Sequence, residues 1–287
     1  LTALVLARLM REAGLPDGVL NVVPGLGEST GAALVDSDVD MISFTGSTDV
    51  GRKIAAQAGS DLKKVTLELG GKSPSIVFAD SDLDKAATGA LFTFCVHQGQ
   101  LCSAGPRLLV EASIRDEFVG RLVGMAEELR VGDPADDSTQ LGAVMSQEQM
   151  DRIEGYVESG IEQGARPLTG AERVTVDGLE NGLFYRPTVF EDVSTDMKIA
   201  QEEIFGPVLS VLPFSSDDEA VGLANDVLYG LAAGIWTNDL RRAHRFAREV
   251  EAGIVYVNTM NALAPWSPYS GWKQSGLGVE GGVEQAE

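Results

Sequence analysis

The sequence of 287 residues has only two cysteines, Cys95 and Cys102, and only two histidines, His97 and His244. Two cysteines cannot build a disulfide framework, and such low usage suits a reducing compartment, so we expect a cytoplasmic protein. A structural zinc site usually takes four ligands in recognisable pairs, which these four residues do not form. We therefore expect no metal site.

Long apolar runs and an excess of basic residues are also lacking. No run approaches the length of a membrane span, and no signal-peptide pattern is visible. Lys and Arg total 22 against 43 Asp and Glu, which gives a net charge of −21. Such a charge repels nucleic acids and anionic membranes, so we expect neither as a partner. The chain begins with Leu1 inside a helical pattern, and we expect it to be the C-terminal portion of a longer protein.

Strand and helix patterns alternate at short spacing along the chain, which favours an α/β fold with a parallel sheet and helices on its faces. The predicted domains are 1–70, 71–274 and a return segment, 275–287. Residues 164–182 read as a polar surface excursion. The predicted strands are 19–23, 41–44, 64–68, 75–78, 108–110, 208–212, 232–236 and 253–257, and the predicted helices are 4–13, 28–34, 46–59, 82–96, 114–130, 147–163, 216–225 and 239–250.

Cys102 follows a helical pattern and a turn at Gly99-Gln100, and it precedes an apolar run. A thiol held at such a turn can act as a nucleophile when a positive group, a helix N-terminus or a base favours its thiolate. The alternative is a small buried hydrophobic residue, the usual role of an isolated cysteine. From this segment alone, both interpretations stay open.

Three further segments contain residues that can bind a cofactor or accept a proton. The strand-to-helix turn Phe44–Gly51 can bind a phosphate, or its Ser and Thr side chains can simply cap the helix. Glu68 ends a strand, where it can accept a proton from water or pair with Lys72 at the surface. In 202–207, a carboxylate can hold a ribose and an aromatic residue can pack on a flat ring, unless this is an ordinary loop.

Taken together, these segments resemble the aldehyde dehydrogenase family. The resemblance implies a Rossmann-like cofactor domain, present here in part, and a second α/β catalytic domain. It also implies oxidation of an aldehyde to a carboxylic acid with NAD or NADP, and a homo-dimer or homo-tetramer. Six motifs in family order carry it: Phe-Thr-Gly-Ser-Thr at 44–48, Leu-Glu-Leu-Gly-Gly-Lys-Ser-Pro at 67–74, Gln-Gly-Gln-Leu-Cys-Ser-Ala at 98–104, Glu-Glu-Ile-Phe-Gly-Pro at 202–207, Tyr-Gly-Leu-Ala at 229–232 and Ser-Gly-Trp-Lys-Gln-Ser-Gly at 270–276.

The resemblance also implies roles for individual residues. Cys102 is the nucleophile that forms a thiohemiacetal and then a thioester, and Glu68 is the general base for hydrolysis. Glu203 is implied at the ribose on the nicotinamide side, and Phe205 beside the nicotinamide. The further implied cofactor contacts are Thr45, Gly46, Ser47, Gly51, Leu69, Gly70 and Gln149. In the loop 259–270, the expected substrate-lining residues are Trp266 and Tyr269.

The chain departs from the family pattern at some positions. His97 stands where Asn is usual, and Val279 stands where Arg is usual. The family's oxyanion Asn and the Lys that binds the adenosine ribose would lie upstream of Leu1. Two alternatives remain open: an acyl-phosphate or CoA-acylating reductase, which does not need Glu68, and an inactive relative or fragment that retains only the fold. The sequence does not specify the aldehyde.

Overall fold

The computed structural model describes residues 1–262 and 264–283, and the chain forms two compact units. The first unit consists of Leu1–Ser43 and Arg52–Val65, and the second consists of Phe44–Gly51 and Thr66–Glu287. The division predicted at residue 70 stays a prediction, as does the return segment 275–287, of which 284–287 lie outside the described residues. No helix in the described part of the chain is long and apolar enough to cross a membrane.

The first unit contains most of the predicted N-terminal elements, but the strand predicted at 19–23 is wrong. Gly18 has a φ of 90°, and the Asn21 side chain donates to the Gly18 carbonyl oxygen over 2.8 Å. These features make a turn, and no strand pairs with this segment in the described part of the chain. The observed elements are α1 (Thr2–Glu12), a π-helix (Gly27–Gly31), α2 (Ala32–Asp36), β1 (Met41–Thr45), α3 (Thr48–Ser60) and β2 (Lys64–Glu68), of which β1, α3 and β2 extend partly into the second unit.

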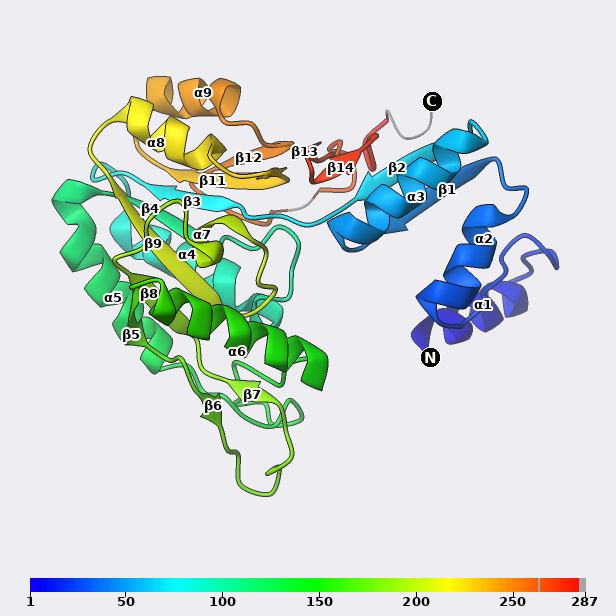
Figure 1. Ribbon diagram of the computed structural model, residues 1–287, viewed down its shortest axis with the longest axis horizontal. Helices are drawn as coiled ribbons and strands as arrows, with labels where there is room; N and C mark the ends of the chain where they lie inside the picture. Colours follow the sequence, from blue (N-terminus) through cyan, green and yellow to red (C-terminus); the bar gives the residue numbers. More distant parts are fainter. Residues whose placement is uncertain (263, 284–287) are drawn as a thin grey trace. The chain divides into compact units, whose positions relative to one another are not determined.

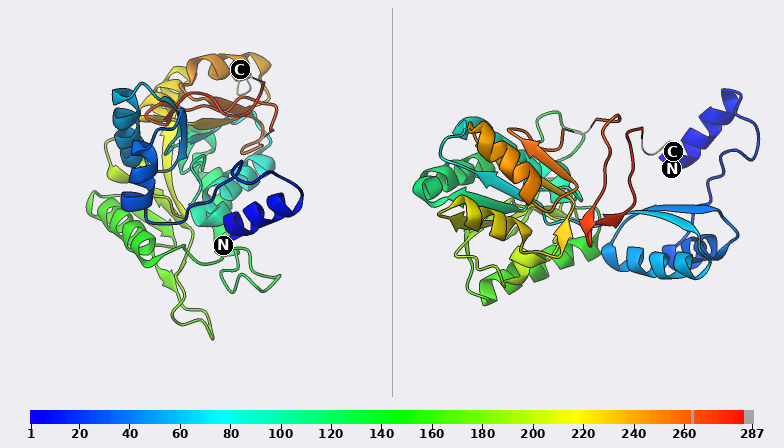
Figure 2. Two further views of the ribbon diagram at one scale, coloured as in Figure 1. Left: turned by 90° about the vertical axis from the view of Figure 1, so that its right-hand side faces the viewer. Right: turned by 90° about the horizontal axis from the view of Figure 1, so that it is seen from above.

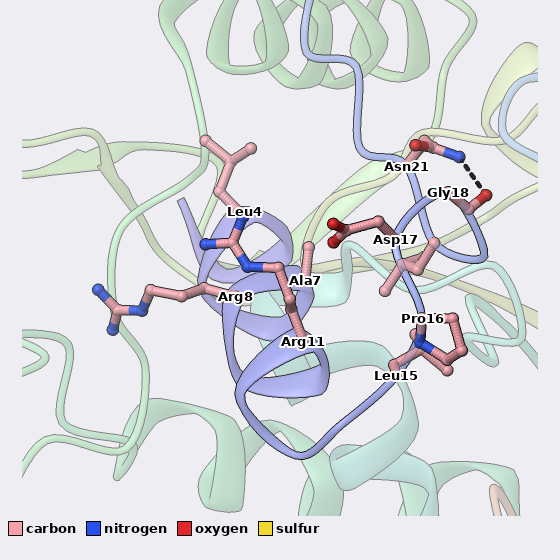
Figure 3. Close-up of a pocket in the computed structure, with 10 residues that line it drawn as sticks. Leu4, Ala7, Arg8, Arg11, Leu15, Pro16, Asp17, Gly18 and Asn21 are labelled. Carbon is pink, nitrogen blue, oxygen red and sulfur yellow. Dashed lines mark hydrogen bonds between the residues drawn. The ribbon is translucent and has the colours of Figure 1, made fainter.

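A cavity of about 410 Å³ lies in the first unit, between α1 and the turn that follows it. Figure 3 shows the side chains that line it, among them Arg8, Arg11 and Asp17. None of the predicted catalytic, cofactor or substrate residues lines this cavity. None of the residues of α1 is buried, so its apolar side chains are exposed.

The second unit is built on a seven-stranded sheet with the order β12-β11-β3-β4-β9-β8-β5. All neighbouring strands are parallel except β5, which runs antiparallel to β8. The predicted α/β fold with a parallel sheet is therefore confirmed. The strands are β3 (Pro74–Val77), β4 (Arg107–Glu111), β5 (Arg166–Thr169), β8 (Thr188–Glu191), β9 (Val208–Phe214), β11 (Ala232–Trp236) and β12 (Ile254–Val257).

The prediction of a surface excursion over 164–182 is partly wrong. This stretch contains β5 and also β6 (Arg173–Val174), which pairs with β7 (Phe184–Tyr185). Its polar composition hid the strands because β5 is an edge strand, which pairs with one strand among the described residues and has partly exposed side chains.

Helices cover both faces of this sheet (Figure 1, Figure 2). Successive strand side chains point to opposite faces, so Ile76 belongs to one apolar core and Val77 to the other. One core is closed by α4 (Leu83–Cys95) and α5 (Arg115–Glu127). The other core is closed by α6 (Gln147–Glu162), α7 (Lys198–Gln201), α8 (Asp217–Asn225) and α9 (Leu240–Glu249).

Short strands fix the C-terminal part of the chain. β10 (Tyr229–Gly230) pairs with β13 (Trp272–Lys273). β14 (Gly276–Leu277) runs antiparallel to the end of β2, where Gly276 lies opposite Glu68. The pairing of β14 with β2 places Gly276 and Leu277 beside the end of the strand that carries Glu68.

Phe78 is the centre of an aromatic cluster and offers a test of the fold. It is 1% exposed, and its ring packs edge-on against Phe214 and Phe246 at 5.0 and 5.3 Å. Phe78→Ala should lower the free energy of unfolding by about 3–5 kcal/mol because it leaves a cavity. Phe92→Ala is the control, since Phe92 is 53% exposed and should change stability little. Chemical denaturation followed by circular dichroism measures both, and equal losses would contradict this account of the core.

Candidate active site

Cys102 follows an uncommon turn between α4 and β4. The backbone of His97, Gln98 and Gly99 is left-handed at three consecutive residues, with φ values of 50°, 58° and 69°. Glycine enters this region without strain, and His and Asn tolerate it better than most residues. A Cβ on Gly99 would lie 2.2 Å from the Gly206 carbonyl oxygen, so this position also requires glycine for space. The turn leaves Cys102 partly exposed.

The glycine pair Gly70-Gly71 lies close to two of the predicted site residues, Cys102 and Glu203. A Cβ on Gly71 would lie 2.3 Å from the Cys102 carbonyl oxygen, and a Cβ on Gly70 would lie 2.6 Å from Glu203 Oε2. The Gly71 N–H donates to Glu203 Oε1 over 3.0 Å. Glu203 and Glu68 both act electrostatically on the Cys102 thiol. The structure therefore brings the predicted nucleophile, base and ribose-binding carboxylate into one site.

Glu68 is buried at the end of β2, with 5% of its surface exposed. Its Oε2 atom has no hydrogen-bond partner among the described residues. Burial raises the pKa of Glu68 to about 7, and the charge of Glu280 adds to this effect. A carboxylate that titrates near neutral pH suits a general base. The alternative of a surface pair with Lys72 is wrong, because Lys72 is buried and its Nζ also lacks a hydrogen-bond partner in the described part of the chain.

Glu203 lies in the loop before β9, and its carboxylate is held from several sides. Burial raises the pKa of Glu203, while the Gly71 N–H and the charges of Arg152 and Lys72 oppose this shift. Arg152 also donates to the backbone oxygen of Glu203 over 2.6 Å. A fixed carboxylate of this kind can accept two hydrogen bonds from a diol.

Phe205 adopts a φ of 61°, a strained conformation of the kind that clusters at functional sites. Gln149 stabilises it, because its side-chain amide donates to the carbonyl oxygens of Ile204 and Phe205 over 2.9 and 2.8 Å. Ser146 caps the start of α6 and accepts from the Gln149 N–H. The structure thus shows Gln149 as a support of Phe205, and its contact with an adenosine ribose stays a prediction.

The predicted phosphate-binding turn lies beside β2. The Gly46 N–H donates to the Glu68 carbonyl oxygen over 3.0 Å. Ser47 Oγ accepts a hydrogen bond from the Val50 N–H over 3.3 Å. This is the helix-capping role that was the alternative to phosphate binding. A Cβ on Gly51 would lie 2.4 Å from a methyl group of Leu69, so glycine is needed for this packing. Cofactor contacts stay predictions for Thr45, Gly46, Ser47, Gly51, Leu69 and Gly70.

The two aromatic residues expected to line the substrate site have different surroundings. Trp266 is 81% exposed, whereas Tyr269 is half-buried and its hydroxyl acts to lower the pKa of the Cys102 thiol. Tyr256 also lies near this thiol, and its buried hydroxyl has no hydrogen-bond partner in the described part of the chain. Tyr269 therefore lies near Cys102, and the contacts of Trp266 and Tyr269 with a substrate stay predictions. In the loop 259–270, residue 263 lies outside the described residues.

The two thiols differ in their environment. Cys95 is 6% exposed, and burial raises its pKa far above the ordinary value. Burial also raises the pKa of Cys102, but hydrogen bonds from the Tyr269 hydroxyl and the Ser103 backbone oppose this shift. Only a thiolate is an effective nucleophile, so Cys102 is the better candidate of the two. Across the described residues, no group of three or more His, Cys, Asp or Glu side chains could hold a metal ion.

Two residues of the C-terminal segment shape the site but were missed in the sequence. Ser275 Oγ donates to the Gly70 carbonyl oxygen over 2.7 Å and accepts the Gly230 N–H over 2.9 Å. Glu280 exchanges backbone hydrogen bonds of 2.6 and 2.7 Å with Tyr269. The motif at 270–276 was a signal for Ser275. No pattern in the sequence indicated that the charge of Glu280 acts on Glu68, which lies far away in the chain.

Lys72 and Arg107 are buried cations next to the site. Arg107 is 2% exposed and donates to the carbonyl oxygens of Lys72, Leu223 and Ala224, each over 2.8 Å. These bonds join β4 to the end of α8 and to the segment after Gly71. Burial lowers the pKa of Lys72 to about 7, Arg107 adds to this effect, and the charge of Glu203 opposes it.

This geometry places a partly exposed cysteine near two buried carboxylates, and comparison with known proteins shows the family of the chain. A family model described as "Aldehyde dehydrogenase family" matches residues 1–287. The chain therefore belongs to the aldehyde dehydrogenase family.

Individual relatives agree with this result. The chain is 46% identical to a betaine aldehyde dehydrogenase of Brucella anthropi over 284 residues, which cover 99% of this chain and 58% of that protein. The NAD-dependent aldehyde dehydrogenase from Sinorhizobium meliloti has a TM-score of 0.96 and 46% identity, over 99% of this chain and 56% of that one. An NAD+ complex of an aldehyde dehydrogenase from Bacillus cereus has a TM-score of 0.96 and 44% identity, over 99% and 57% of the two chains. The chain thus spans little more than half the length of these relatives.

The buried ammonium of Lys72 should make stability depend on pH. Its pKa falls from 10.5 to about 7 on folding, so between these values the unfolded state binds more protons and stability rises with pH. Lys72→Met should therefore be more stable than the parent below about pH 7. This advantage should shrink by up to about 1.4 kcal/mol per pH unit toward pH 10.

The measurement is the denaturation midpoint of both proteins across this pH range. Arg107 titrates in both proteins, so its effect cancels in the difference. A difference that does not change with pH would show that Lys72 carries the same charge in the folded and unfolded states.

Proposed function

We propose that the protein containing this chain oxidises an aldehyde to a carboxylic acid with NAD or NADP. The observation that carries the proposal is the meeting of Cys102, Glu68 and Glu203 around Gly70-Gly71. A thiol supplies the nucleophile for a covalent route, and a carboxylate that titrates near pH 7 supplies the base. The relatives' names, which state aldehyde dehydrogenase activity, support the same reaction.

The residues around Glu203 fit a dinucleotide. The Glu203 carboxylate lies over the bare backbone of Gly70, in a space that a Cβ would fill, and a carboxylate there can hold a ribose diol. Phe205 follows Glu203 by two residues and has a φ of 61°, and an aromatic residue there can pack against the flat nicotinamide ring. When bound, the cofactor supplies the hydride acceptor. The NAD+ complex of the Bacillus cereus relative supports NAD as the first cofactor to test.

The chain's own residues account for the bond-making steps. The Cys102 sulfur adds to the aldehyde carbon, and the thioester formed after oxidation remains on this sulfur. Glu68 then takes a proton from water, and the hydroxide equivalent attacks the thioester and releases the carboxylic acid. The buried, near-neutral Glu68 favours hydrolysis over transfer to phosphate or CoA, which needs no such base.

The remaining features of the proposal concern substrate, assembly and location. Betaine aldehyde is the first substrate to test, because relatives at 46% identity carry that name. Aliphatic and aromatic aldehydes complete the test panel. We propose a homo-dimer or homo-tetramer in the cytoplasm, supported by the family resemblance and by the two free cysteines.

Cys102→Ala in the full-length protein tests the nucleophile. Aldehyde-dependent formation of NADH should fall by roughly 10³-fold or more, because the other cysteine of this chain, Cys95, is buried in the core. Cofactor binding, followed by quenching of protein fluorescence, should persist. Cys95→Ala is the matched control and should keep its activity, since Cys95 is buried in the core. Comparable turnover in the Cys102 variant would refute the assignment.

Glu68→Gln tests the base. The burst of NADH from the first turnover should persist, while thioester hydrolysis slows by about 10²–10⁴-fold. In the parent, hydrolysis should speed up as pH rises through about 7, because the ionised form of Glu68 is the base. Rapid-mixing absorbance measurements at several pH values separate the two phases. If hydrolysis in the variant keeps the parental rate and pH dependence, another group activates the water.

A further inference from the structure

We propose that Tyr156 on α6 is a positioning residue for the cofactor, and that it acts through Glu202 and Arg152 on the segment that carries Glu203. This inference rests on the proposed function, since it assigns a further residue to the binding of the same dinucleotide. The Tyr156 hydroxyl donates to Glu202 Oε2 over 2.7 Å. Tyr156 itself need not touch the cofactor, because its two neighbours transmit its effect to Glu203.

One face of α6 lies against the segment 202–205. Gln149, Arg152 and Tyr156 are spaced three and four residues apart, which puts them on the same side of the helix. Arg152 donates to the Glu203 carbonyl oxygen over 2.6 Å. Gln149 donates to the next two carbonyl oxygens of the segment over 2.9 and 2.8 Å. With the bond from Tyr156, each of these four consecutive residues is bonded to the same helix face.

Side chains, rather than pairing with other backbone, hold this segment. In the described part of the chain, the N–H and carbonyl groups of residues 203–205 make no hydrogen bond with another backbone group. Backbone polar groups away from water need partners, and here α6 supplies them for the carbonyl oxygens. The path of the segment therefore depends on the side chains of one helix face.

Tyr156 joins Arg152 to Glu202. Its hydroxyl accepts a hydrogen bond from Arg152 Nη2 over 3.4 Å, and its ring centre lies 5.3 Å from the Arg152 guanidinium and 5.9 Å from the Lys198 ammonium. Burial and the hydrogen bond to Glu202 raise the pKa of Tyr156, so the hydroxyl stays a donor at neutral pH. Loss of this hydroxyl leaves Glu202 without its tyrosine donor and Arg152 with one acceptor fewer.

The position of Glu203 matters because its carboxylate works at short range. The Gly71 N–H holds one end of the residue, at Oε1, over 3.0 Å, and Arg152 holds the other end, at the backbone carbonyl. A carboxylate binds a diol through two hydrogen bonds only when both hydroxyls lie within about 3 Å of its oxygens. A small shift of the backbone end should therefore weaken the contact with a ribose on the nicotinamide side.

The test measures binding to the full-length protein by isothermal titration calorimetry. In Tyr156→Phe, the dissociation constant for NAD+ should rise about three- to tenfold, the usual effect of one lost hydrogen bond. The dissociation constant for ADP, which lacks the nicotinamide and its ribose, should not change. An equal change for NAD+ and ADP, or no change for NAD+, would overturn the inference, because a role in the stability of α6 alone predicts no selective loss.

Steady-state kinetics supply a second readout. The KM for NAD+ should rise by the same factor in Tyr156→Phe, whereas kcat at saturating NAD+ and the KM for the aldehyde should match the parent. A fall in kcat with an unchanged KM for NAD+ would contradict a role in positioning the cofactor.

Tyr185→Phe is the matched control. Tyr185 on β7 belongs to the core that α6 closes, and the charges of Glu154 and Glu158 on the same helix act on it. This variant should keep the parental affinity for both NAD+ and ADP. The same selective loss of NAD+ in both variants would overturn the inference, since it would show a general effect of tyrosine hydroxyls beside α6.

Glu202→Ala removes the same contact from the other side and covers the case in which Tyr156→Phe does not fold. Glu202 is exposed, so this variant should fold, bind NAD+ more weakly and bind ADP as the parent does. In the double variant, the loss of NAD+ affinity should be smaller than the product of the two single losses, because the two changes break one bond. Losses that multiply would overturn the route through Glu202.

These results separate the inference from the proposed reaction. A parent that binds NAD+ but oxidises no aldehyde would refute the proposed reaction, while the binding constants would still decide the role of Tyr156. A parent that binds neither NAD+ nor NADP+ would overturn both.

Discussion

The candidate site depends on the close approach of bare backbone at Gly70-Gly71 to the Cys102 carbonyl and the Glu203 carboxylate. A side chain at Gly71 would collide with the Cys102 carbonyl, and one at Gly70 would collide with the Glu203 carboxylate. Both distances are shorter than real Cβ contacts, so a side chain at either position would force a shift, and at Gly71 the atom that would have to move is backbone. Glu68 lies in the same region because it precedes this glycine pair in the sequence.

Burial of charge is the second feature that organises this region. Glu68, Lys72 and Arg107 are each at most 5% exposed, and burial displaces the pKa of each toward neutrality. Arg107 has carbonyl partners for its donors, whereas Glu68 Oε2 and Lys72 Nζ have no hydrogen-bond partner within the described residues. Unsatisfied charged groups destabilise a fold, and at a functional site they are the groups that respond to protons. The same burial thus weakens the fold and raises the pKa of Glu68 to about 7.

Much of the second unit could be predicted from the sequence because its strands and helices are strongly patterned. The end of β2 and the start of α4, where Asp82 caps the helix, follow from local signals. The strand predicted at 19–23 failed because apolar residues alone do not make a strand without a hydrogen-bonded neighbour. The alternative of a surface Lys72–Glu68 pair failed because burial depends on the whole sheet, which two nearby motif residues do not reveal.

The site is joined by contacts between residues that are far apart in the chain. Ser275 bonds Gly70 across 205 residues, and Tyr269 and Glu280 come from the same late segment. The seven-stranded sheet ends at Val257 and is complete before that segment is made. Until that segment has been synthesised, the Gly70 carbonyl lacks its bond to Ser275 and the end of β2 lacks its pairing with β14.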